Sequence, residues 1–117
     1  MKICIISTHA PYGTSLSRDA IETLLVTASY GFDATLLVMG DGVLQLLADQ
    51  DPTAIAQKST ASLLQAAKMY GVERLLVCRE DLHERGLSQE DLIDSLQFVA
   101  REQIASLVRE HHRVLAF

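Results

Sequence analysis

Residues 72–87 read VERLLVCREDLHERGL, and the pattern changes sharply in the middle of them. The first half is a short apolar run of the kind that forms a buried strand in a parallel sheet. Acidic and helix-favouring residues follow Cys78 at once, and Gly86 is suited to end a short helix. Cys78 is therefore predicted at a strand-to-helix junction, on the rim of the sheet, where helix N–H groups favour a thiolate. The alternative is that Cys78 is a small buried apolar residue at a strand end.

The same alternation of strands and helices extends along the chain. Apolar runs predict strands at residues 2–8, 34–39, 72–78, 96–99 and 113–117. Helical patterns lie before Tyr30-Gly31 and at residues 43–47, 60–69, 79–85 and 101–111. This order implies right-handed crossovers between parallel strands. We therefore predict an α/β fold, a single three-layer (α/β/α) domain over residues 1–117, with a mainly parallel sheet of about five strands.

Three segments have more specific patterns. Val43–Leu47 is unusually apolar for a short helix, so it either packs on its own sheet or makes a subunit contact. Asp51-Pro52 is typical of a helix start, and Ser88 with Asp91 has the spacing of a capping box. Residues 92–99 fit neither period cleanly, and we interpret them as a helical turn followed by a strand.

The composition excludes several classes of function. The 117 residues carry a formal charge of −5 and no long basic run, so direct binding of nucleic acid is not expected. No apolar run is long enough to span a membrane, and the N-terminus has no signal-peptide pattern. The two cysteines, Cys4 and Cys78, have neither CxxC nor metal-site spacing. We expect a reduced, cytoplasmic protein without metal or cofactor, in which Cys4 belongs to the core.

Candidate site residues follow three of the predicted strands. His9 lies after the first strand, Asp41 after the second, and Cys78 at the end of the third. Because parallel strands end at one edge of a sheet, a histidine, an aspartate and a cysteine are predicted on one rim. A histidine there can take the proton of a thiol and activate it. The alternatives are an ordinary loop histidine for His9 and a helix cap for Asp41.

Four segments together resemble a known family. They are STHAPYGT at residues 7–14, GDGVLQLL at 40–47, VC at 77–78 with ERGL at 84–87, and VLAF at 114–117. In this order they resemble the DsrE/DsrF-like sulfur-relay family, and within it the TusC/DsrF branch. The resemblance covers the whole chain.

The resemblance implies a role in a complex. A chain of this branch is expected to assemble with TusB-like and TusD-like subunits as a two-fold heterohexamer. The complex relays persulfide sulfur from a TusA-like donor to a TusE-like acceptor. The end use is 2-thiouridine at the wobble position of certain tRNAs or, in DsrEFH relatives, sulfur oxidation. Cys78 falls where the family has its sulfur-carrying cysteine, although the essential cysteine is usually assigned to the TusD/DsrE-type subunit.

Three hypotheses about function therefore remain open. The chain is a scaffold subunit whose partner performs the chemistry, or it carries persulfide itself on Cys78. The third hypothesis is a small-ligand-binding α/β domain without sulfur chemistry.

Overall fold

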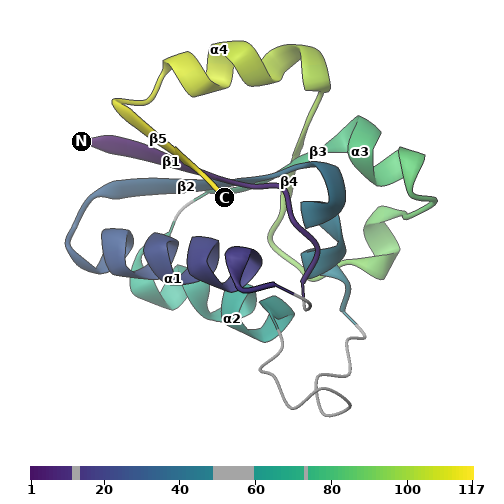
Figure 1. Cartoon of the computed structure of the whole chain (residues 1–117), viewed down its shortest axis with the longest axis horizontal. Coiled ribbons are helices and arrows are strands. Elements are labelled where there is room, and N and C mark those ends of the chain that lie inside the picture. The colour runs from purple at the N-terminus through teal and green to yellow at the C-terminus, as the bar shows by residue number, and fades with distance from the viewer. Residues whose placement is uncertain (12–13, 49–59, 73) are drawn as a thin grey trace.

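A five-stranded parallel sheet lies at the centre of this computed structural model, which describes residues 1–11, 14–48, 60–72 and 74–117 (Figure 1). The strands are β1 (Lys2–Ser7), β2 (Asp33–Val38), β3 (Arg74–Cys78), β4 (Gln97–Val99) and β5 (Arg113–Ala116). Their order across the sheet is β4-β3-β2-β1-β5, and every neighbouring pair runs parallel. The predicted α/β fold with a parallel five-stranded sheet is confirmed.

Helices flank both faces of the sheet (Figure 1). Helices α1 (Leu16–Ser29) and α2 (Thr60–Ala66) lie on one face, and α4 (Ile104–Arg109) lies on the other. Helix α3 (Arg79–Glu84) follows β3 directly, at the edge where the strands end. The shorter 3-10 segments are η1 (Gly40–Leu46), η3 (Ala67–Tyr70), η4 (Gln89–Asp91) and η5 (Arg101–Gln103). The helices predicted at residues 60–69 and 101–111 thus each combine an α-helical and a 3-10 segment.

The two faces of the sheet bury apolar cores of different size. Along β3, Leu75 and Val77 belong to the larger core on the side of α1 and α2, whereas Leu76 belongs to the smaller core. The buried members of the smaller core are Cys4, Leu37, Leu76 and Leu107. Cys4 has no exposed surface, which confirms that it is a core residue.

Segment η1 packs against its own domain. Val43 and Leu46 have no exposed surface and belong to the larger core, which supports the first of the two alternatives for Val43–Leu47. Gly42 allows this close approach, because a Cβ atom there would lie 2.3 Å from the carbonyl oxygen of Ser7. The helix start predicted at Asp51-Pro52 falls outside the described residues.

Residues 92–96 differ from the prediction. The strand expected at 96–99 is present as β4, but the helical turn predicted just before it is wrong. The turn lies earlier, in η4, where the carboxylate of Asp91 accepts a hydrogen bond from the N–H of Ser88 at 2.9 Å, as the predicted capping box requires. Leu92 instead forms an antiparallel bridge with Leu47, and the N–H of Ile93 donates to the carbonyl of Leu46. Backbone pairing with η1 therefore replaces the local turn.

Candidate functional site

The predicted rim exists, but its three candidate side chains are not joined. Strands β1, β2 and β3 end at Ser7, Val38 and Cys78, so the loops that carry His9 and Asp41 leave the same edge as Cys78. Among the described residues, no hydrogen bond or ion pair connects any two of His9, Asp41 and Cys78. The His9 side chain is exposed and contacts the hydroxyl of Thr8. The proposed activation of the thiol by His9 has no support in this geometry.

Cys78 lies at the junction that the sequence indicates, but its side chain is not on the rim. It is the N-cap residue of α3 and has no exposed surface, so the prediction of a rim thiol is wrong. Burial raises the pKa of Cys78, and the neighbouring carboxylate of Asp81 raises it further by accepting the thiol's hydrogen bond. The backbone N–H groups of Asp81 and Glu80 act in the opposite direction, as predicted, but they are outweighed.

Asp81 connects three segments of the chain beside this thiol. Its side chain is buried, and its Oδ2 accepts a hydrogen bond of 2.7 Å from the N–H of Gly40, at the start of η1. Its Oδ1 accepts one of 2.5 Å from the guanidinium of Arg101, at the start of η5. Burial alone would raise the pKa of Asp81, but the hydrogen bonds from Gly40, Arg101 and Cys78 outweigh it and lower this pKa. Asp81 is therefore a carboxylate that holds α3, η1 and η5 together.

Arg101 binds α3 in two further ways. Its guanidinium lies 3.0 Å from a carboxylate oxygen of Glu84, and its backbone N–H donates to both carboxylate oxygens of Glu80. The hydrogen bond from this N–H lowers the pKa of Glu80, and the two carboxylates of Asp81 and Glu84 raise the pKa of Arg101. The acidic start of α3 is therefore compensated by one arginine from a distant part of the sequence.

Asp41 is an anchor for α3 and not a helix cap. Its Oδ1 accepts hydrogen bonds from Nε and Nη2 of Arg85, at 3.1 and 2.9 Å. Arg85 also donates to the carbonyl of Asp81 at 2.9 Å. The N-cap position of η1 is occupied by Met39, without a side-chain cap. Asp41 thus holds the C-terminal end of α3 through Arg85, in addition to the contacts that Arg101 makes with the helix.

The sequence reasoning missed Gln45. This residue has no exposed surface, and its Nε2 donates to the hydroxyl of Ser7 at 2.7 Å and to the carbonyl of His9 at 3.2 Å. These bonds attach η1 to the end of β1. The available signal was a polar residue inside the apolar run VLQLL at residues 43–47. It also missed Asp81 and Arg101 as a pair, which no local pattern could have joined.

Two negative findings concern the described part of the chain only. There, no group of three or more His, Cys, Asp and Glu side chains is placed to hold a metal ion. No described helix is long and apolar enough to cross a membrane.

Sequence comparisons decide the family. A profile of the DsrE/DsrF-like family matches residues 1–117. The chain belongs to the DsrE/DsrF-like family. A TusC homologue from Vibrio parahaemolyticus is 36% identical over 108 residues, which are 92% of this chain and 92% of that protein. The intracellular sulfur oxidation protein DsrF from Allochromatium vinosum is 36% identical over 93 residues, 80% of this chain and 68% of DsrF. TusC from Escherichia coli is 34% identical over 86 residues, 74% of this chain and 72% of that protein.

These matches confirm the resemblance to the TusC/DsrF branch. A structural comparison agrees about the fold. The ychN protein from E. coli superposes with a TM-score of 0.88 and 24% sequence identity, covering 99% of this chain and 98% of that one. At this identity the likeness concerns the fold alone.

Proposed function

We propose that this chain is the TusC/DsrF-type subunit of a sulfur-relay complex and that it serves there as a scaffold. TusB-like and TusD-like subunits complete a two-fold heterohexamer. The complex passes persulfide sulfur from a TusA-like donor to a TusE-like acceptor, for 2-thiouridine synthesis at the tRNA wobble position. The similarity to TusC homologues and to DsrF over most of the chain supports this role.

The state of Cys78 supports a scaffold over a carrier. A thiol that accepts sulfur must reach a sulfur atom on another protein, and the thiolate is the attacking form. Cys78 has no exposed surface, and burial and the Asp81 carboxylate raise its pKa. Both features oppose nucleophilic attack, so we assign the sulfur-carrying cysteine to the TusD-like partner.

A second candidate is a persulfide carrier that uses Cys78 itself. The observation in its favour is the position of Cys78 at the strand-to-helix junction, where the N–H groups of Glu80 and Asp81 partly oppose the rise in its pKa that burial causes. In such a step the Cys78 thiolate attacks the outer sulfur of a donor persulfide. The donor's S–S bond breaks, the donor leaves as a thiolate, and Cys78 becomes the persulfide, with no oxidant required. Because Cys78 has no exposed surface, this step requires the structure around the thiol to open.

Transfer of labelled sulfur through the reconstituted complex distinguishes the two candidates. We expect Cys78→Ser in this subunit to leave both assembly and transfer nearly unchanged, because the serine hydroxyl keeps a donor for Asp81. The matched control replaces the sulfur-carrying cysteine of the TusD-like partner and should abolish transfer. Loss of transfer with Cys78→Ser, in a complex of unchanged size, would assign the carrier role to Cys78. Failure of the chain to assemble with TusB-like and TusD-like subunits would contradict the proposal as a whole.

A further inference from the structure

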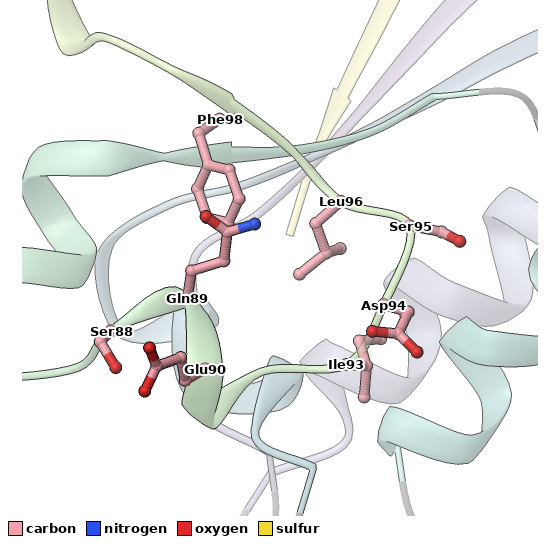
Figure 2. Close-up of a pocket in the computed structure, with 8 residues that line it drawn as sticks. All are labelled: Ser88, Gln89, Glu90, Ile93, Asp94, Ser95, Leu96 and Phe98. Atoms are coloured by element: carbon pink, nitrogen blue, oxygen red, sulfur yellow. The ribbon is translucent and has the colours of Figure 1, made fainter.

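A groove lies beside β4, at the edge of the sheet opposite β5. Its main cavity of about 570 Å³ lies between η4 and β4 (Figure 2), and its lining residues are Ser88, Gln89, Glu90, Ile93, Asp94, Ser95, Leu96 and Phe98. A second cavity of about 220 Å³ shares Asp94 and Ser95 with the first and extends to Leu64, Lys68 and Leu75. The two cavities are therefore adjacent at Asp94 and Ser95, and together we call them the groove.

We propose that this groove binds an extended segment of a partner protein, in which an apolar side chain is followed closely by a lysine or arginine. Three features of the groove favour this occupant: an apolar floor, two exposed carboxylates in its lining, and a strand edge that pairs with no further strand among the described residues. The proposal is independent of the sulfur-relay function, and its failure would leave that function untouched.

The apolar floor provides the site for an anchoring side chain. Ile93 is buried, and Leu96 and Phe98 are half-buried against the larger core. Figure 2 shows Leu96 and Phe98 on the β4 side of the cavity and Gln89 and Glu90 on the opposite side, in η4. A cavity of this size lies within the usual range for binding sites, about 300–1,000 Å³. One branched or aromatic side chain placed there removes from water both its own apolar surface and that of the groove.

The carboxylates define the charge of the occupant. Glu90 and Asp94 are both exposed, and neither makes an ion pair with any residue in the part of the chain that the structure describes. Both line the main cavity, so they give its surroundings a negative charge that attracts a cationic side chain of the occupant. Lys68 also lines the second cavity, and its charge disfavours a long basic run in the occupant. A single basic residue next to the apolar anchor fits this arrangement better than a polycation.

The free strand edge favours an extended segment over a compact ligand. Within the part of the chain that the structure describes, strand β4 is terminal in the sheet and pairs with β3 alone. Alternate N–H and C=O groups of a terminal strand point away from the sheet and can pair with an added strand. In a strand, side chains two positions apart point to the same face. An anchor and a basic residue with that spacing can therefore reach the apolar floor and the carboxylates together.

The test uses the full chain labelled with ¹⁵N and a synthetic peptide with blocked ends. The peptide has eight residues of alternating threonine and valine, with one central leucine and a lysine two positions after it. We expect saturable chemical-shift changes for the backbone amides of Gln97–Val99. The chemical shifts of the Val114 and Leu115 amides, on the other edge of the sheet, should stay unchanged. A matched peptide with glutamate in place of the lysine should bind several-fold more weakly.

Two variants test the residues assigned to the groove. Glu90→Gln with Asp94→Asn should weaken binding of the lysine peptide by about threefold to tenfold and abolish its preference over the glutamate peptide. Leu96→Ser should weaken both peptides, and its amide spectrum reports whether the fold is retained. Equal binding of the two peptides, changes centred on β5, or no binding at millimolar peptide would each overturn the proposal. Concentration-dependent changes at β4 without peptide would assign the groove to a second copy of the chain, and would also overturn it.

Discussion

Cys4 and Cys78 are both free and have no exposed surface, yet their surroundings differ. Cys4 lies in the middle of β1 among apolar side chains of the smaller core, and burial raises its pKa to about 11. Cys78 lies at the end of β3, where burial also raises its pKa but the carboxylate and N–H of Asp81 reach it. The comparison teaches that burial alone does not determine the chemical environment of a thiol. Cys78 is hydrogen-bonded to Asp81, which holds α3, η1 and η5 together, whereas Cys4 contributes to packing only.

The alkaline stability of the fold should depend on Cys4. Its pKa rises from 9.0 to about 11 on folding, so the unfolded chain loses the thiol proton more easily. The contribution of the Cys4 thiol to the free energy of unfolding is therefore fully present below pH 9. About 2–3 kcal/mol of it is lost as the pH rises towards 11. Urea unfolding of the wild type and of Cys4→Ala between these pH values measures the effect. Parallel pH profiles for the two proteins would show that the Cys4 thiol is not protected as described.

Removal of the Asp81 carboxylate should have the next largest effect. Asp81→Ala leaves the N–H of Gly40 and the thiol of Cys78 without an acceptor, and it should lower the free energy of unfolding by about 2 kcal/mol. Arg101 is half exposed and regains water, so it adds little to this cost. Asp33→Ala, at an exposed position, is the control and should change stability by less than about 0.5 kcal/mol. Similar losses for both variants in urea would contradict the role of Asp81.

Serine substitutions compare the two cysteines directly, with the smallest expected effects. Cys4→Ser places a hydroxyl among Leu37, Leu76 and Leu107 and should cost about 1–2 kcal/mol of unfolding free energy. Cys78→Ser should cost less than about 1 kcal/mol, because its hydroxyl donates to Asp81 as the thiol does. Both values come from urea unfolding at neutral pH. A larger loss for Cys78→Ser than for Cys4→Ser would reverse the comparison.

The fold was largely predictable because its signals are local. Uninterrupted apolar runs such as residues 2–8 and 72–78 indicate buried parallel strands, and the helices between them impose the crossovers. Residues 92–96 were not predictable in this way. Their backbone groups pair with Leu46 and Leu47, which are distant in the sequence, so no local period describes them.

The candidate site was predicted only in part, for the same reason. The junction at Cys78 follows from the local change of pattern, and it is where the structure places it. The burial of Cys78 could not be predicted from this local pattern. Its neighbour Asp81 is held in place by Gly40 and by Arg101, which lie about 40 and 20 positions away in the sequence. A loop histidine and aspartate sharing one edge suggested a catalytic set, but Asp41 instead pairs with Arg85.

The mass of this subunit during sulfur transfer tests the scaffold assignment most directly. The reconstituted complex, with TusB-like and TusD-like subunits and a persulfide-loaded TusA-like donor, is quenched during turnover, and each intact subunit is weighed. The buried, protonated thiol of Cys78 predicts that the mass of one added sulfur atom is found on the TusD-like subunit and not on this one. An added sulfur atom on this subunit that is absent from its Cys78→Ser variant would contradict the account and establish Cys78 as a carrier.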